Sequence, residues 1–109
     1  MHDFVVSEPL VIIAQDAGHG KVLARILTEH GYQPANADYG DALATVGVVR
    51  PRLVVLGICD CMQGHEVAQK IHSAFPEVRL IVLVPEGEYR MGLDFLEEGA
   101  SDFLFKPVS

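Results

Sequence analysis

Short apolar runs recur along this chain and alternate with stretches in which apolar residues follow helical spacing. The strongest runs are rich in valine, isoleucine and leucine, as expected of strands that are buried on both faces of a parallel sheet. The five candidate strands are Leu10–Ala14, Gln33–Ala37, Leu53–Leu56, Leu80–Val84 and Asp102–Phe105. Gln33–Ala37 has the weakest pattern, and its Pro34 favours a place at the edge of the sheet.

The stretches between these runs predict four amphipathic helices. Their apolar faces consist of Val22, Leu23, Ile26 and Leu27; Ala42, Leu43, Val46 and Val49; Val67, Ala68, Ile71, Ala74 and Phe75; and Met91, Phe95 and Leu96. A glycine or proline follows each stretch, which is typical of a helix end. These residues are Gly31, Pro51, Pro76 and Gly99. The alternation of strands and helices predicts a doubly wound α/β fold with right-handed crossovers.

The segment Gly18-His19-Gly20 separates the first candidate strand from the helix that we expect over Lys21–His30. Its spacing fits neither a Walker phosphate loop nor the glycine fingerprint of dinucleotide-binding domains. We therefore expect a turn that leads into the first helix.

The length of 109 residues favours one domain, and a hydrophobic content of 50% is enough for a buried core. The net charge of −7 argues against a nucleic-acid or anionic-membrane partner, because both need clustered cations. The apolar runs are much shorter than the roughly 20 residues of a membrane-spanning helix, and the start lacks the features of a signal peptide. Because Cys59 and Cys61 are too few for a disulfide framework, we expect a cytoplasmic protein.

One pattern extends over nearly the whole chain, from Leu10 to Ser109. Its segments are Glu97–Pro107 (EEGASDFLFKP), His30–Tyr32 (HGY), Gly40–Leu43 (GDAL) and Arg50–Leu56 (RPRLVVL). This pattern resembles the receiver domain of response regulators in bacterial two-component signalling. The resemblance implies a flavodoxin-like, five-stranded parallel sheet with strand order 2-1-3-4-5.

In that family an aspartate at the end of the third strand accepts a phosphoryl group from a phosphohistidine. Two acids after the first strand help this aspartate to hold Mg²⁺, a hydroxyl ends the fourth strand, and a lysine after the fifth strand pairs with the phosphoryl group. The matching positions in this chain are Gln15 and Asp16, Gly57, Val84 and Lys106.

Three of these positions depart from the family pattern. Gly57 has no nucleophile, Val84 has no hydroxyl and Gln15 has no carboxylate. Because phosphoryl transfer depends on positioning and charge neutralisation, we expect a degenerate receiver that lacks a phosphoacceptor. We expect neither enzymatic activity nor a cofactor nor a metal site, since Asp16 is the one remaining candidate metal ligand. We expect Asp16 to form an ion pair with Lys106 instead.

The family's output surface corresponds to Tyr89–Phe105, with Tyr89, Phe103 and Phe105 as its aromatic residues and Phe103 at the switch position. The resemblance implies a protein partner or an attached output domain, and without a phosphoryl group we expect the domain to stay in one state. It also implies a cis bond between Lys106 and Pro107.

A fifth helix should follow the last strand, but the chain ends at Ser109. We therefore expect one receiver-like domain over residues 1–109, truncated before that helix. The sheet face that the helix would cover should expose apolar side chains, which favours pairing with another chain, such as a second copy.

Other interpretations remain open at this stage. Asp60 could replace the missing acceptor, or Cys59, Cys61 and His65 could form a metal or redox site, although their spacing is not a strong zinc pattern. Ala14–His19 aligns with the cobalt-binding motif of cobalamin-binding domains, which share this topology, but the histidine is out of place. An enzyme would need a deep pocket with convergent polar groups at the strand ends.

Overall fold

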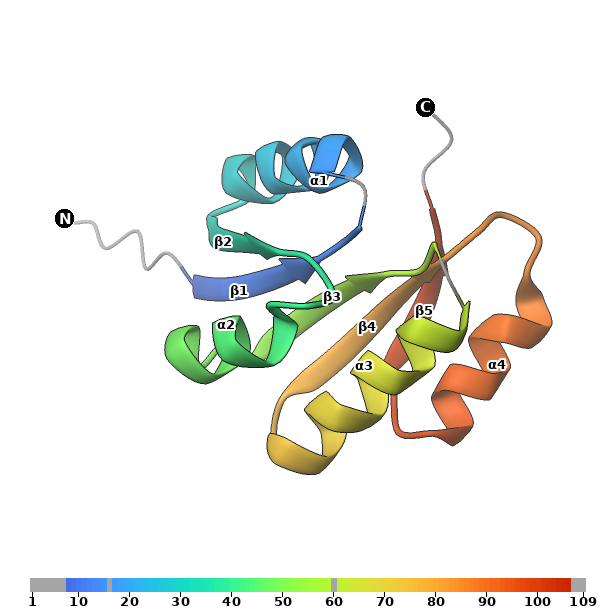
Figure 1. Ribbon diagram of the computed structural model, residues 1–109. Coiled ribbons are helices and arrows are strands. Elements are labelled where there is room, and N and C mark those ends of the chain that lie inside the picture. Colours follow the sequence, from blue (N-terminus) through green and yellow to red (C-terminus); the bar gives the residue numbers. More distant parts are fainter. Residues whose placement is uncertain (1–7, 16, 60, 107–109) are drawn as a thin grey trace, which may run out of the picture.

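The computed structural model describes residues 8–15, 17–59 and 61–106 (Figure 1). Its elements are β1 (Glu8–Ile13), α1 (Ala17–Glu29), β2 (Tyr32–Ala37), α2 (Ala42–Val49), β3 (Leu53–Gly57), α3 (Cys61–Ala74), β4 (Arg79–Val84), α4 (Tyr89–Glu97) and β5 (Asp102–Phe105). The strands form one parallel sheet in the order β2-β1-β3-β4-β5. The predicted fold class and strand order are confirmed.

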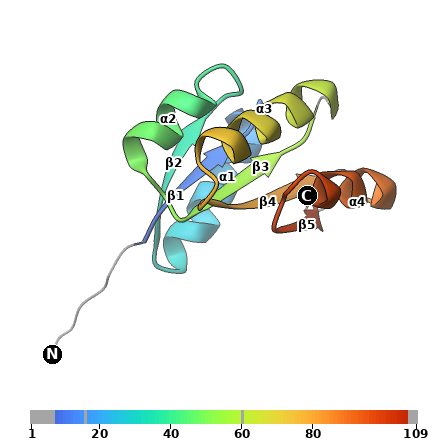
Figure 2. The same cartoon turned by 90° about the horizontal axis from the view of Figure 1, so that it is seen from below.

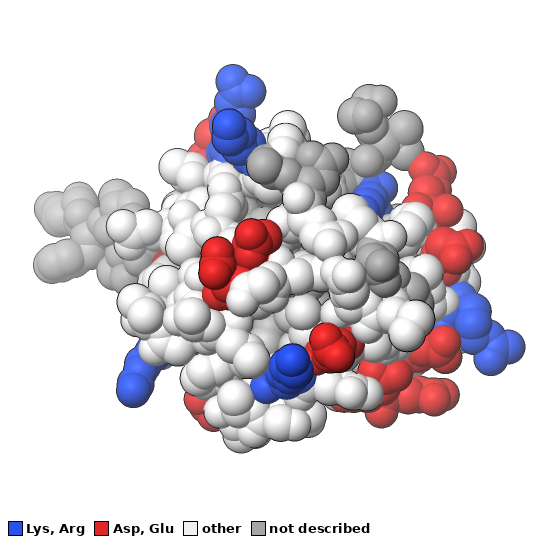
Figure 3. All heavy atoms as spheres, in the orientation of Figure 1, with Lys and Arg blue, Asp and Glu red and all other residues white. Residues whose placement is uncertain are grey.

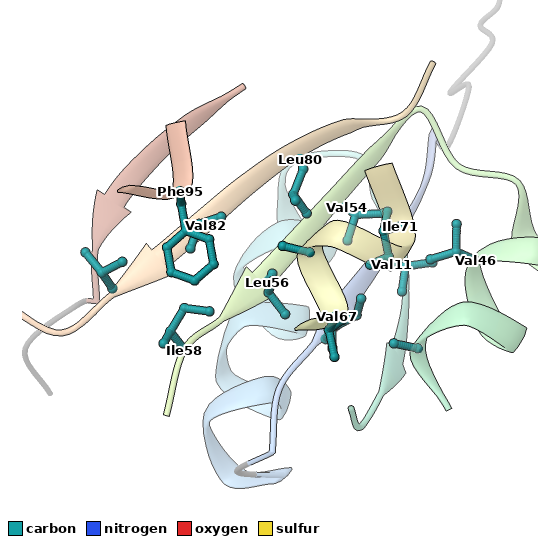
Figure 4. Packing of buried hydrophobic residues seen from close by; sticks show 14 residues of the cluster. Val11, Val46, Val54, Leu56, Ile58, Val67, Ile71, Leu80, Val82 and Phe95 are labelled. Carbon is teal, nitrogen blue, oxygen red and sulfur yellow. The ribbon is translucent and has the colours of Figure 1, made fainter. Parts of the chain in front are cut away.

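The helices divide between the two faces of the sheet. Figures 1 and 2 show α1 on one face and α2, α3 and α4 on the other. Two buried clusters match these layers: a small one in which β1, β3 and β4 face α1, and a larger one in which the sheet meets the other three helices (Figure 4). No helix in the described part of the chain is both long and apolar enough to span a bilayer.

The central strands are apolar throughout because both of their faces are covered. In β1, Leu10 and Ile12 pack toward α1, whereas Val11 and Ile13 pack toward the larger cluster, and all four are buried. This alternation follows from the two-residue repeat of a strand. The less apolar β2 lies at the edge of the sheet, where Pro34 costs no ladder hydrogen bond on the open side.

Two helices begin earlier than the sequence pattern predicts. The segment Gly18-His19-Gly20 lies in α1, so the predicted turn there is wrong. α3 begins at Cys61, before its first predicted apolar residue, Val67. An apolar repeat does not mark either start, because glycine and polar residues interrupt the spacing in the sequences AGHG and CMQG.

Two of the four residues of the predicted apolar face of α1 are packed against the sheet, and the other two are exposed. Leu23 and Leu27 pack against the sheet, whereas Val22 and Ile26 are 53% and 44% exposed. Leu104 is 53% exposed and, since Phe103 belongs to the larger cluster, it points to the α1 face. This face therefore exposes apolar side chains, as expected; its pairing with another chain stays a prediction.

Two glycines inside helices lie in opposite environments, and alanine should reveal the difference. A Cβ atom at Gly92 of α4 would overlap the ring of Phe103, whereas one at Gly47 of α2 would lie 3.6 Å from Cζ of Phe75, an ordinary contact. We expect Gly92→Ala to lower the free energy of unfolding by about 1–3 kcal/mol through overpacking. Gly47→Ala should raise it by about 0.5–1 kcal/mol through helix propensity.

Urea denaturation of both variants beside the wild type measures these changes. Equal shifts in the same direction would contradict the described packing of α4 on β5.

Candidate functional site

The carboxyl ends of the strands meet at one edge of the sheet, and they bring distant residues together. β3 ends at Gly57, β4 ends at Val84, Gln15 follows β1 and Lys106 follows β5. β1 and β3 are neighbours from which the chain winds in opposite directions, and this is where ligand crevices form in open α/β sheets. The sequence-predicted positions therefore share one region of the molecule.

Gly57 is buried and leaves the end of β3 without a side chain. A Cβ atom built on it would lie 3.6 Å from the carbonyl oxygen of Ile13 and 3.8 Å from Cβ of Ala14, which are ordinary contacts. The local backbone therefore does not demand glycine, and the first carbon of a larger residue would fit.

Tyr39, from the connection between β2 and α2, occupies hydrogen-bonding positions at the end of β3. Its hydroxyl donates to the carbonyl oxygen of Gly57 at 2.6 Å and accepts from the backbone N–H of Cys59 at 3.3 Å. The sequence analysis missed Tyr39, because an aromatic residue in a loop gives no signal of a contact 18 positions away. This tyrosine ties the β2–α2 connection to the end of the central strand.

A backbone hydrogen bond fixes Lys106 at the carboxyl edge of the sheet, and its side chain extends toward the loop after β3. Its N–H donates to the carbonyl oxygen of Val84 at 2.7 Å, and its Nζ lies 3.6 Å from Sγ of Cys59. The ion pairs of the described residues are Arg52–Glu8, His65–Glu98 and Lys70–Glu66, and none of these includes Lys106. The predicted partner Asp16 and the predicted cis bond to Pro107 lie outside the described residues.

Gln15 and Val84 face different surroundings. Nε2 of Gln15 donates to Oε1 of Gln63 at 2.8 Å, so the two amides link the end of β1 to the first turn of α3. Gln63 gave no signal in the sequence analysis. The Val84 side chain is fully buried in the larger apolar cluster. The position therefore contributes packing to the site.

The predicted metal or redox combination of Cys59, Cys61 and His65 stays a prediction, since it includes the side chain of Cys61. The described part of the chain has no group of three potential His, Cys, Asp or Glu ligands. His65 lies in α3 and contacts Glu98 at 2.6 Å. The side chain of Cys61 and the whole of Asp60 lie outside the description.

The predicted output residues lie together on α4 and β5. The ring centroid of Tyr89 is 5.7 Å from those of Phe103 and Phe105, and these two lie 6.0 Å apart, all in edge arrangements. Tyr89 is 63% exposed and Phe105 38%. Figure 3 shows acidic side chains gathered on the side where α4 lies. The acids of this region are Glu86, Glu88, Asp94, Glu97 and Glu98.

Comparison with known families agrees with this arrangement. Residues 10–109 match the response regulator receiver domain. The chain belongs to this family. The match favours a receiver over a cobalamin-binding domain.

Individual receivers resemble the chain over most of its length. The chemotaxis protein CheY of Thermotoga maritima is 29% identical over 89% of this chain and 84% of its own length. The nitrogen assimilation regulatory protein NtrX of Azorhizobium caulinodans is 27% identical over 95% of this chain but only 24% of its own length. The crystal structure of the NtrX receiver domain from Brucella abortus has a TM-score of 0.83, with 25% identity over 92% of this chain and 87% of that one.

Removing the Tyr39 hydroxyl tests the link at the end of β3. Tyr39→Phe keeps the ring but leaves the Cys59 N–H without this acceptor, so we expect a loss of about 1 kcal/mol in unfolding free energy. Tyr89→Phe removes an exposed hydroxyl and should change it by less than about 0.5 kcal/mol. Urea denaturation followed by circular dichroism measures both; equal effects would speak against the Tyr39 bridge.

Proposed function

We propose that this receiver domain lacks a phosphoacceptor and acts through protein–protein contacts that do not depend on phosphorylation. The observation that carries the proposal is the pairing at Gly57: the position has no nucleophile, and a tyrosine hydroxyl binds its carbonyl oxygen. Membership of the receiver family supports the signalling role, because receivers act on other proteins or on attached output domains.

The other described positions at this edge support the same proposal. Phosphoryl transfer needs an attacking oxygen, cations that neutralise the developing charge and donors for the equatorial oxygens. Gln15 offers a neutral amide, Val84 offers a methyl surface, and Lys106 contacts a thiol. These residues do not fit Mg²⁺, which prefers carboxylate oxygens, so the proposal includes no metal-dependent step.

The surface of α4 and β5 is the proposed docking site for the partner. Its exposed aromatic rings provide contact area, and the surrounding acids would orient a partner with basic residues. The chain spans 24% of the length of NtrX of Azorhizobium caulinodans, and the proposed partner is another signalling protein or an attached output domain. We place the domain in a bacterial cytoplasm, which its bacterial relatives and the free thiol of Cys59 support.

Incubation with Mg²⁺ and a small phosphodonor such as acetyl phosphate tests the lack of an acceptor. We expect the intact mass of the wild type to stay unchanged, because no carboxylate extends from Gly57. CheY of Thermotoga maritima, treated in parallel, verifies the phosphodonor and the detection. A hydroxylamine-sensitive gain of one phosphoryl group in the wild type would contradict the proposal.

Two variants show why the wild type does or does not gain a phosphoryl group. The combination Gln15→Asp, Gly57→Asp and Val84→Thr restores the family's residue types and should produce the hydroxylamine-sensitive gain, since Gly57 has room for a Cβ atom. If the wild type itself gains mass and Asp60→Asn abolishes that gain, the alternative acceptor Asp60 is correct and the proposal is wrong.

A further inference from the structure

α3 and α4 meet through an aromatic stack and a hydrogen bond that share one histidine. The ring of His65 on α3 lies parallel to that of Phe95 on α4, with centroids 3.9 Å apart and an interplanar angle of 2°. Nδ1 of the same ring lies 2.6 Å from Oε1 of Glu98 and donates to this carboxylate. One side chain therefore contacts both the core-facing and the solvent-facing parts of the α4 carboxyl end.

Phe95 anchors this contact in the core. It is fully buried, and Figure 4 shows it beside Val82 of β4 and Ile58, which follows β3. Gly64 precedes the histidine and allows the close approach, since a Cβ atom there would lie 2.6 Å from Cδ1 of Ile58. The His65 ring therefore stacks on a ring that the core packing holds in place.

The carboxyl end of α4 needs such support because its own sequence opposes the helix. Asp94, Glu97 and Glu98 lie near the end, where the partial charge of the helix is negative, and the last turn holds no basic residue. A helix of nine residues is also too short to be stable alone. Tertiary contacts must therefore hold this turn in place.

We propose that His65, Phe95 and Glu98 form a clamp that fixes α4 against α3 and keeps the α4–β5 surface in one arrangement. This inference rests on the proposed function, since it explains how the domain presents a constant surface without phosphorylation. The connection to the surface is direct: α4 packs through Gly92 on Phe103, and Tyr89 at its amino end contacts Phe103 and Phe105.

Hydrogen exchange of the backbone amides, followed by NMR, tests the clamp. The reporters are the N–H groups of Glu98, Gly99 and Ala100, which donate to carbonyl groups of the last turn of α4. In His65→Ala, we expect these amides to exchange about tenfold faster than in the wild type, because the stack and the hydrogen bond are lost together. Amides of β3 should keep their rates, which separates local opening from global unfolding.

Matched variants separate the clamp from general effects of mutation. Gln69→Ala alters an exposed residue of the same helix and should leave the exchange of α4 unchanged. Glu98→Gln keeps a hydrogen-bond acceptor but removes the negative charge, and it should accelerate exchange. Glu97→Gln removes a negative charge one residue earlier, where no contact with His65 is described, and it should not accelerate exchange. His65→Phe keeps a stacked ring and should give a rate between those of the wild type and His65→Ala.

The clamp is overturned if His65→Ala and Gln69→Ala give equal exchange in α4. If His65→Ala does not fold, two other comparisons test the clamp: Glu98→Gln against Glu97→Gln, and His65→Phe against the wild type. Equal exchange rates within both comparisons overturn the clamp. The exchange rates are measured on the protein without a phosphodonor, so they test the clamp alone. A mass gain with the phosphodonor would contradict the proposed function without altering these rates.

Discussion

The parallel pairing of β1 with β3 is the constraint on which the rest of the structure depends. Both strands are apolar on two faces, so they are stable only between layers of helices. Each crossover helix then returns the chain to the same end of the sheet. As a consequence, the carboxyl ends of the strands meet at one edge, where residues as distant in the sequence as Gln15 and Lys106 both lie.

At this edge, three side-chain contacts tie the ends of the strands to their surroundings. An amide pair joins Gln15 to Gln63, a phenol joins Tyr39 to the backbone of β3, and an ammonium faces a thiol. The amide pair and the phenol make these links without the charge repulsion that a cluster of carboxylates creates. These contacts link the ends of β1 and β3 to α3 and to the β2–α2 connection.

The other end of this signalling fold, α4 with β5, combines a locally unfavourable helix with strong tertiary anchors. Its acids oppose the helix at its carboxyl end, while Phe95 is fully buried and Phe103 packs beneath Gly92. Local sequence and tertiary packing thus pull in opposite directions. Elements of this kind respond most readily when a single contact is changed.

The sequence by itself determined the layers of the fold, because burial on both faces leaves a continuous apolar run and a helix leaves a repeat of 3.6 residues. The aligned motifs also placed Gln15, Gly57, Val84 and Lys106 at the ends of their strands. The starts of α1 and α3 had no such signal, since glycine and polar residues interrupt the apolar spacing there. Only the tertiary structure decided that Tyr39 meets Gly57 and that His65 meets Phe95 and Glu98, because these contacts join side chains from separate elements, and no periodic pattern along the chain encodes which side chains will meet.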